Sequence, residues 1–193
     1  GTSMGGQQSL CVAGLHDKPT HLIVNVPAGC DLNACLHGRQ AGYPFFPCHD
    51  AAAMNTARYF DAVNFAPRIK AKSLVALGFV DDICPPAGIW TAYNRIPAPK
   101  EIVPLVESPH NHLATPDQQR AFVERSEAWL AALARGEQPQ LIHRGHTAGA
   151  HRPAARTDEN SRLAHEQLLA KATAGRIDVY FIGDSITRRW GCT

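Results

Sequence analysis

The chain opens on the pattern Gly-x-Ser-x-Gly, in which the central serine is Ser3. The pattern is typical of a nucleophile elbow, a strained turn between a strand and a helix that lifts a serine hydroxyl above a sheet. Such a serine attacks a carbonyl carbon when a base takes its proton and a carboxylate orients that base. The five residues alone arise by chance in roughly one chain in twenty or thirty, so the interpretation depends on the partners that follow Ser3.

Candidate partners follow Ser3 in the order Ser, Asp, His that is characteristic of α/β-hydrolases. Asp81 and Asp82 come directly after an apolar run, and His110 and His112 come just after the next one. Because the carboxyl ends of parallel strands gather at one edge of a sheet, we expect these side chains to lie close to Ser3. The sequence therefore predicts a Ser-Asp-His hydrolase triad, and its residues alone leave open which Asp and which His take part.

The segments that must position these residues alternate between extended and helical patterns. Strands are expected at 20–26, 72–80 and 100–106, and helices at 4–16, 50–65, 87–95 and 116–135. Pro104 predicts that the third strand lies at a sheet edge. Thr115, with Gln118 three residues later, is typical of a capping box at a helix start. This alternation predicts an α/β fold with a mostly parallel sheet wrapped by helices.

Between the first two expected strands, residues 28–47 form an irregular stretch that is rich in Gly and Pro. A loop of this length is generally either functional or poorly ordered. Its aromatic residues are Tyr43, Phe45 and Phe46, and they follow the carboxyl end of a strand. We expect these three side chains to form a wall of the substrate pocket.

The six cysteines contain no Cys-x-x-Cys pair, which argues against a zinc site or a thioredoxin-like redox site. Cys30, Cys35 and Cys48 lie close enough in sequence for one disulfide, but free thiols are the expectation. The histidines between residues 143 and 151 have no acidic or cysteine partners, so they indicate solvated loop residues and no metal site. We expect no cofactor.

Composition narrows the remaining classes of function. The 193 residues carry a formal net charge of +2, and no run of Lys or Arg forms a nucleic-acid footprint. No apolar run approaches the ~20 residues of a membrane span. We therefore expect neither a nucleic-acid partner nor a membrane partner.

Residues 81–102 carry three short motifs in one order: Asp-Asp-Ile-Cys-Pro-Pro, then Thr-Ala-Tyr-Asn, then Pro-Lys-Glu-Ile. This series resembles the acetyl xylan esterase / cephalosporin C deacetylase family. The resemblance covers about residues 1–135, which correspond to the second half of that family's α/β-hydrolase domain. It implies a partial α/β-hydrolase fold, with a parallel sheet and helices on both faces.

The resemblance also implies roles for individual residues. Ser3 corresponds to the nucleophile, Asp81 to the orienting carboxylate and His110 to the base. The backbone N–H of Met4 corresponds to one oxyanion-hole donor, and the second donor belongs to an earlier loop of the family. The chain departs from the family at Asn111, where Glu usually follows the histidine, and at the residues on either side of Ser3.

The resemblance implies a serine esterase that acts on a small acylated substrate, such as the acetyl esters of xylan or of another carbohydrate. Three alternatives stay open: a peptidase or a general carboxylesterase on the same triad, and a degenerate hydrolase domain that only binds. The family often forms oligomers, so a homo-oligomer is compatible with the resemblance. The location is unknown from the sequence, and a polysaccharide substrate favours a secreted or periplasmic protein.

A chain that opens on the elbow is interpreted as the carboxyl-terminal half of a longer esterase domain. We expect residues 1–136 to form that half-domain. Without the preceding strands and the second oxyanion donor, we expect this piece alone to be poorly stable and inactive.

The last third of the chain predicts a second domain. Residues 137–160 lack periodicity and are expected to be a linker, followed by a helix at 161–174 and a strand at 177–182. The strand runs into Gly-Asp-Ser, which resembles the start of a GDSL-type (SGNH) hydrolase of flavodoxin-like fold. The resemblance implies that Ser185 is the nucleophile of this domain, which residues 161–193 begin and do not complete.

Overall fold

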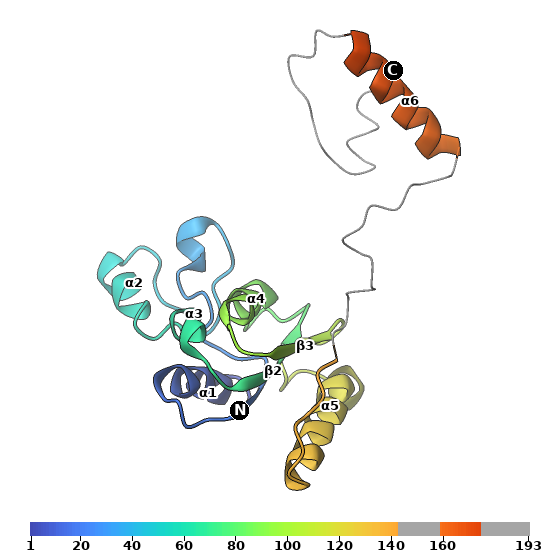
Figure 1. The fold of residues 1–193 in the computed structure, drawn as a ribbon. Coiled ribbons are helices and arrows are strands. Elements are labelled where there is room, and N and C mark those ends of the chain that lie inside the picture. Colours follow the sequence, from blue (N-terminus) through green and yellow to red (C-terminus); the bar gives the residue numbers. More distant parts are fainter. Residues whose placement is uncertain (143–158, 175–193) are drawn as a thin grey trace. The chain divides into compact units, whose positions relative to one another are not determined.

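The structure is a computed structural model that describes residues 1–142 and 159–174 (Figure 1). The chain divides into two compact units, residues 1–144 and 145–193. The described part of the first unit holds the sheet and helices α1 to α5, and that of the second holds α6.

Three parallel strands form a sheet in the order β1-β2-β3. Their bounds are β1 (His21–Asn25), β2 (Lys72–Gly78) and β3 (Lys100–Leu105). Pro104 lies in β3, at the edge of the described sheet, as its missing N–H predicts. On the other side, Thr2 forms an isolated parallel bridge with Asn25 of β1. The residues leading to Ser3 therefore run alongside β1 as a further strand-like segment, and the expected parallel sheet is confirmed.

Helices lie on both faces of this sheet, with α1, α3 and α4 on one face and α5 on the other (Figure 1). Their bounds, with two 3₁₀ turns, are α1 (Met4–Leu15), η1 (Ala34–His37), α2 (Ala51–Ala57), α3 (Ala62–Phe65), η2 (Ala66–Arg68), α4 (Pro86–Arg95) and α5 (Pro116–Ala134). Successive strand residues point to opposite faces. Val75 and Leu77 join the core beneath α1 and α4, whereas Leu74 and Ala76 pack with Trp129 of α5. A parallel sheet with helices on both faces is the arrangement that the resemblance to the α/β-hydrolase family implies.

The helix expected at 50–65 is wrong in one respect, because the structure breaks it into α2 and α3. Asp61 caps α3 by accepting a hydrogen bond from the amide of Val63. The same buried carboxylate accepts from the amides of Asp31 and Leu32 in the loop after β1. An aspartate that satisfies three amides stabilises a new helix start at its own position, and the apolar spacing alone does not reveal this.

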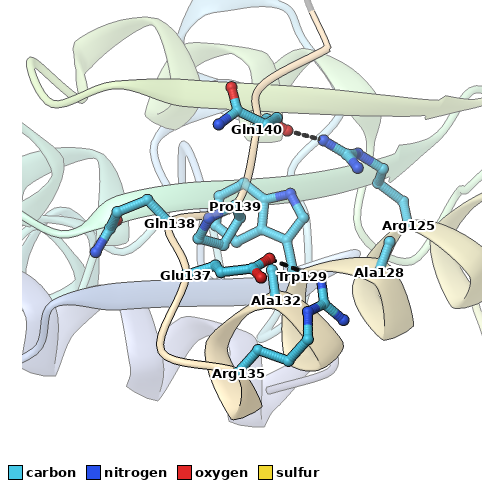
Figure 2. A pocket seen from close by; sticks show the side chains of 9 residues that line it. All are labelled: Arg125, Ala128, Trp129, Ala132, Arg135, Glu137, Gln138, Pro139 and Gln140. Atoms are coloured by element: carbon cyan, nitrogen blue, oxygen red, sulfur yellow. Dashed lines mark hydrogen bonds and ion pairs between the residues drawn. The ribbon is translucent and has the colours of Figure 1, made fainter.

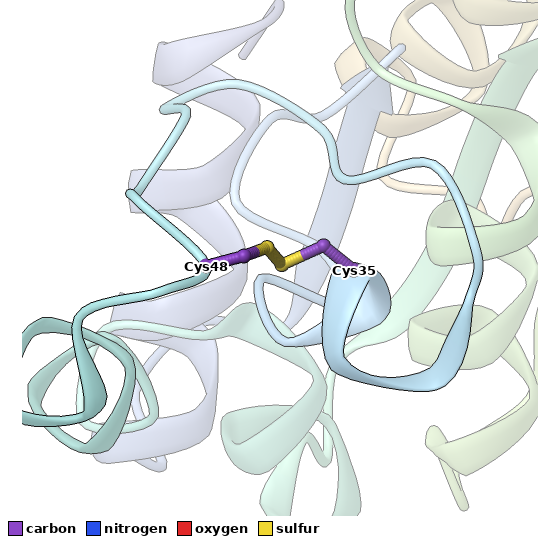
Figure 3. The surroundings of a disulfide bond; sticks show 2 residues. All are labelled: Cys35 and Cys48. Atoms are coloured by element: carbon purple, nitrogen blue, oxygen red, sulfur yellow. A yellow bond between two sulfur atoms is a disulfide. The ribbon is translucent and has the colours of Figure 1, made fainter.

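The expectation of free thiols is wrong for Cys35 and Cys48, which form a disulfide (Figure 3). Cys35 lies in η1 and Cys48 lies just before α2, with Cα atoms 6.2 Å apart. The two cysteines are 13 residues apart in sequence. The bond therefore joins a residue inside the irregular stretch 28–47 to the residue just after it. Spacing in sequence did not identify this pair, because the path of the irregular loop between the two cysteines decides whether they meet. Among the described residues, Cys11, Cys30 and Cys84 are free.

Helix α5 begins and ends as the sequence predicts. Thr115 and Gln118 form the capping box, with each side chain bonded to the other's main chain. Gly136 takes a left-handed φ of 73° just after the helix, and its amide bonds to the carbonyl of Leu133. Such a C-terminal turn requires a conformation that favours glycine.

The segment after α5 returns to the sheet. Lys72 donates a hydrogen bond to the carbonyl of Pro139, and the amide of Ile142 donates to Glu101 Oε2 at 3.1 Å. Arg125 forms a two-bond ion pair with Glu101 and also donates to the carbonyl of Gln140 (Figure 2). Residues 138–142, which the sequence predicts as part of a linker, thus pack within the first unit.

The second unit is described only through α6 (Glu159–Ala174), which includes the helix expected at 161–174. The strand expected at 177–182 and Ser185 lie outside the described residues. None of the helices in the described ranges combines the length and the apolar character that a membrane span needs.

Candidate active site

Ser3 lies at the turn between the segment bridged to β1 and the start of α1. Its φ of 52° and ψ of −119° are unusual for a residue with a side chain and cost about 1–3 kcal/mol. The surrounding backbone holds this turn. The amide of Ser3 donates to the carbonyl of Asn25 at 3.0 Å, and the amide of Asn25 donates to the carbonyl of Gly1 at 2.9 Å. The amide of Ala28 donates to the carbonyl of Ser3 at 3.0 Å. The elbow is therefore strained and anchored by β1 and by the loop after it.

Small residues allow the tight approach that the elbow needs. A side chain on Gly1 would meet the carbonyl oxygen of Gly5 at 2.3 Å. A side chain on Gly6 would touch Pro27, the residue that follows the end of β1 by two positions, at 3.0 Å. The first turn of α1 can thus lie directly against the end of β1.

His110 connects the three residues that the sequence predicts as a triad. Its Nδ1 lies 2.8 Å from Asp81 Oδ2, and its Nε2 lies 2.9 Å from Ser3 Oγ. An ionised carboxylate can only accept, so the proton of a neutral imidazole belongs on Nδ1 and Nε2 accepts from the Ser3 hydroxyl. The side chains of Asp81 and His110 are 0% and 3% exposed. This arrangement can move a proton from the serine hydroxyl to a buried, oriented imidazole.

The second oxygen of Asp81 is fixed by the backbone. Oδ1 accepts from the amide of Ile83 at 3.0 Å and from the amide of Cys84 at 2.7 Å. These bonds belong to the turn that enters α4, and they leave Oδ2 for His110. Asp82 is exposed, and its carbonyl accepts a hydrogen bond from the side chain of Gln40. The structure therefore brings Asp81 to the histidine and leaves Asp82 at the surface.

His112, the other candidate base, lies beside His110 and is exposed. The two ring centroids are 5.3 Å apart, with an edge-to-face angle of 74°. Of the two histidines, His110 is the one whose ring hydrogen-bonds with Asp81 and with Ser3 in the part of the chain that the structure describes.

Met4 is the first residue of α1. The first N–H groups of a helix have no carbonyl within the helix to bond, and the positive end of the helix dipole lies there. The first bond of this turn runs from the amide of Gln7 to the carbonyl of Ser3. The backbone N–H of Met4 is thus available to a negatively charged oxygen next to Ser3.

The expected pocket wall is tied to the loop that carries Asp81. The amide of Tyr43 donates to the carbonyl of Ile83, and the carbonyl of Tyr43 accepts from the amide of Gly29, both at 2.8 Å. The rings of Tyr43 and Phe45 meet edge to face at 6.0 Å. They are 38% and 63% exposed, while Phe46 is half-buried. Tyr43 therefore stands close in the structure to the turn after β2.

The two hollows found on the described surface lie elsewhere. The larger, of about 480 Å³, lies between α5 and the returning segment and is lined by residues such as Trp129 and Pro139 (Figure 2). The smaller lies beside Leu105 and Gln118. Neither hollow is lined by Ser3, Asp81 or His110.

Cys84 is a second nucleophilic side chain close to this site. Its burial, and then the negative charge of Asp81, raise the pKa of the thiol to about 12, although a contact with Ser3 opposes this shift. A thiol of this pKa stays protonated near neutral pH and does not compete with the serine as a nucleophile.

No group of three or more potential metal ligands occurs among the described residues.

Residues 1–126 match the acetyl xylan esterase (AXE1) family. The chain belongs to this family. The acetyl esterase Axe7A of Xylanibacter ruminicola is 39% identical over 113 residues, which are 55% of this chain and 26% of that protein. The acetyl xylan esterase of Paenibacillus sp. R4 is 29% identical with a TM-score of 0.54, over 66% of this chain and 43% of that one. Acetyl xylan esterase 1 of Thermoanaerobacterium sp. JW/SL YS485 is 28% identical with a TM-score of 0.51, over 57% and 39% of the two chains.

This member of the acetyl xylan esterase family spans about a quarter of the length of the curated relative and about two fifths of the solved ones. The matched stretch contains Ser3, Asp81 and His110 and ends within α5.

Sequence reasoning did not single out Asn25, whose backbone holds the elbow. Its signal is a single side-chain amide within the otherwise apolar run 22–26, just before Pro27.

Proposed function

We propose that Ser3, His110 and Asp81 form the catalytic triad of a serine esterase that removes acetyl groups from carbohydrate esters such as acetylated xylan. The observation that carries the proposal is the pair of hydrogen bonds made by His110, to Asp81 at 2.8 Å and to Ser3 at 2.9 Å. Membership of the acetyl xylan esterase family supports the substrate class. The chain covers only part of its relatives, so the proposal concerns the natural polypeptide that contains it.

In the acylation step, Ser3 Oγ forms a bond to the acetyl carbonyl carbon while its proton passes to His110 Nε2. The carbonyl oxygen becomes negative and accepts the N–H of Met4. The tetrahedral intermediate then breaks its bond to the sugar oxygen, which leaves with the proton from His110. Asp81 stabilises the imidazolium that exists between these transfers.

In the deacylation step, water takes the place of the sugar. His110 accepts a proton from the water, whose oxygen attacks the acetyl group on Ser3. Acetate leaves, and His110 returns the proton to Ser3 Oγ. An oxyanion donor such as the amide of Met4 contributes on the order of 3–4 kcal/mol to the transition state.

We assign the pocket wall to Tyr43, Phe45 and Phe46. The exposed edge-to-face pair of Tyr43 and Phe45 offers apolar ring surface of the kind that stacks on the C–H face of a sugar. The hydrogen bond from Tyr43 to Ile83 supports a position near Asp81. This wall would select the alcohol side of the ester, whereas the triad performs the chemistry.

The test measures acetate release from acetylated xylo-oligosaccharides and p-nitrophenol release from p-nitrophenyl acetate, with the natural polypeptide. We expect both. The variants of the first site, here and below, are assayed in a Ser185→Ala background so that a second esterase site does not contribute. In that background we expect Ser3→Ala to lower both rates by at least about 10⁴-fold. Ser9→Ala is the matched control, because Ser9 lies in α1 and, among the described residues, its hydroxyl bonds to the carbonyl of Gly5 in the same helix. Activity in Ser3→Ala equal to that of the control would sink the proposal.

The same assay separates the alternatives. A general carboxylesterase would hydrolyse p-nitrophenyl acetate without releasing acetate from the oligosaccharide. A peptidase would act on peptide anilides at least as fast as on the acetyl ester. A degenerate domain that only binds carbohydrate would release neither product.

We further propose that residues 161–193 begin a second, GDSL-type esterase domain whose nucleophile is Ser185, with residues up to 160 as a linker. The support is the Gly-Asp-Ser sequence that follows an apolar run. In the natural polypeptide, a Ser3→Ala variant should keep a residual esterase activity that Ser185→Ala then removes. A residual activity that is unaffected by Ser185→Ala would contradict this second domain.

A further inference from the structure

Three polar side chains form a hydrogen-bonded chain behind the Ser3–His110 pair. Asn25 ends β1, Ser108 follows β3, and Gln119 lies near the start of α5. Asn25 and Ser108 are 5% and 0% exposed. Asn25 Nδ2 donates to Gln119 Oε1 at 2.8 Å, and Gln119 Nε2 donates to Ser108 Oγ at 2.7 Å. The Ser108 hydroxyl donates to the carbonyl of Pro109 at 2.8 Å.

The chemistry of these groups fixes the direction of the chain. The hydroxyl of Ser108 has one proton, and it goes to the Pro109 carbonyl, so Ser108 Oγ must accept from its other neighbour. Gln119 therefore presents its NH₂ group to Ser108 and its oxygen to Asn25. Asn25 must in turn present its NH₂ group to Gln119. A reversed amide on Gln119 would break the chain at two of its bonds.

The two ends of the chain meet the backbone beside the proposed nucleophile and base. The Pro109 carbonyl belongs to the peptide group that joins Pro109 to His110. At the other end, the backbone carbonyl of Asn25 accepts from the amide of Ser3 at 3.0 Å. The hydrogen-bonded side chains thus link two peptide groups, the one that precedes Ser3 and the one that precedes His110. The link crosses the sheet and passes through α5.

We propose that Asn25, Gln119 and Ser108 are positioning residues that set the distance between Ser3 Oγ and His110 Nε2. The inference rests on the proposed function for the reaction that this distance serves. The hydrogen bonds of these three side chains in the described structure reach neither the Ser3 hydroxyl nor the His110 ring. They act through the backbone on two loops that otherwise could shift independently. A misplacement of about 1 Å between reacting groups can cost on the order of 10²-fold in rate.

The test uses a fluorophosphonate probe on the natural polypeptide, because its reaction reports the Ser3–His110 geometry without a sugar. Ser3 Oγ bonds to phosphorus, fluoride leaves, and the serine proton passes to His110. Gln119→Met keeps the length of the side chain and removes both of its hydrogen bonds. We expect it to slow fluorophosphonate labelling and the kcat for p-nitrophenyl acetate by about 10-fold, within the range that misplacement can cost, with KM unchanged.

A double-variant cycle distinguishes one network from separate local effects. Asn25→Leu cuts the same chain at its other end, so the variant with both changes should be no slower than the slower single variant. Ser126→Ala is the matched control on α5, since in the described structure its hydroxyl bonds to the carbonyl of Val123 in the same helix. It should label at the wild-type rate.

Three outcomes would overturn the inference. Gln119→Met could label as fast as the control, the double variant could be slowed by the product of the two single effects, or KM could rise while kcat is unchanged. If Gln119→Met does not fold, Gln119→Glu replaces it, because it keeps the acceptor toward Asn25 and removes the donor to Ser108. A wild-type protein that does not label at Ser3 would overturn the proposed function and this inference together; normal labelling of every network variant would overturn the inference alone.

Discussion

Asp81 and His110 are joined by a buried hydrogen bond of 2.8 Å between Oδ2 and Nδ1. The carboxylate is held from its other side by the amides of Ile83 and Cys84, so it cannot turn away from the ring without losing two bonds. The imidazole is therefore kept with its proton on Nδ1 and its free nitrogen toward Ser3. The predictions below depend on this orientation.

Asp81→Asn should leave the fold in place and remove most of the activity. The amide keeps an oxygen for the backbone N–H groups of the turn and presents a donor to Nδ1, which favours the tautomer with the proton on Nε2. We expect kcat for p-nitrophenyl acetate to fall by about 10⁴-fold. Asp82→Asn, on the exposed neighbour, should leave kcat unchanged. Equal losses in the two variants would contradict the role assigned to Asp81.

His110 and His112 can be separated by the same kinetics. His110→Ala removes both hydrogen bonds of the triad, and kcat should fall by at least about 10³-fold. His112→Ala removes an exposed ring that packs edge to face with the ring of His110. Because this is a surface change, kcat should stay within about 3-fold of the wild-type value. The opposite order of effects would make His112 the base.

Gly78 should be intolerant of a side chain. Gly78 is the last residue of β2 and lies against the backbone of Ser108. A Cβ on Gly78 would lie 2.4 Å from the carbonyl oxygen of Ser108 and 3.3 Å from the Cβ of Asp81. Because the closest atom is backbone, Gly78→Ala should lower the free energy of unfolding by about 1–3 kcal/mol and also lower kcat. Urea unfolding measures the first effect.

Gly5→Ala is the control for this prediction. A Cβ at Gly5 meets nothing within 4 Å, and the residue lies in α1. Its unfolding free energy should stay the same or rise by about 0.5–1 kcal/mol. A Gly78→Ala variant as stable as Gly5→Ala would refute the steric argument.

The disulfide between Cys35 and Cys48 should stabilise the loop that carries Tyr43 and Phe45. A double Cys→Ser variant at these positions should lose up to about 3 kcal/mol of unfolding free energy, the loop-closure value for a ring of this size. We also expect KM to rise for acetylated xylo-oligosaccharides and to stay unchanged for p-nitrophenyl acetate, because only the sugar needs the loop. Cys11→Ser is the control. If the double variant and the wild type had the same KM for the oligosaccharides, the disulfide would have no role in substrate binding.

Local patterns in the sequence were enough for most of the strands and helices and for the order of the candidate site residues. The apolar run of β2, the capping box at Thr115 and the edge position of Pro104 each depend on neighbours within a few residues. Placing Ser3, the pair Asp81–Asp82 and the histidines His110 and His112 at the carboxyl ends of parallel strands predicted their order, and the family resemblance then singled out Asp81 and His110. These features needed no knowledge of packing.

The features that the sequence did not reveal depend on contacts between distant segments. Asp61 starts a new helix because its carboxylate also serves the amides of Asp31 and Leu32. The Cys35–Cys48 pair depends on the path of the irregular loop between the two cysteines. The return of residues 138–142 depends on the buried Glu101, and polarity alone indicated a linker.

The central claim is that Ser3 is a nucleophile activated by His110, and its most direct test is to map the fluorophosphonate adduct. The natural polypeptide is treated with the probe, digested, and analysed by mass spectrometry for the peptide that contains residues 1–16. We expect an adduct on Ser3 in the wild type, none in Ser3→Ala, and labelling slowed by at least about 10³-fold in His110→Ala. An unmodified Ser3 in a protein that hydrolyses acetyl esters, or equally fast labelling of Ser3 in His110→Ala, would contradict the central claim.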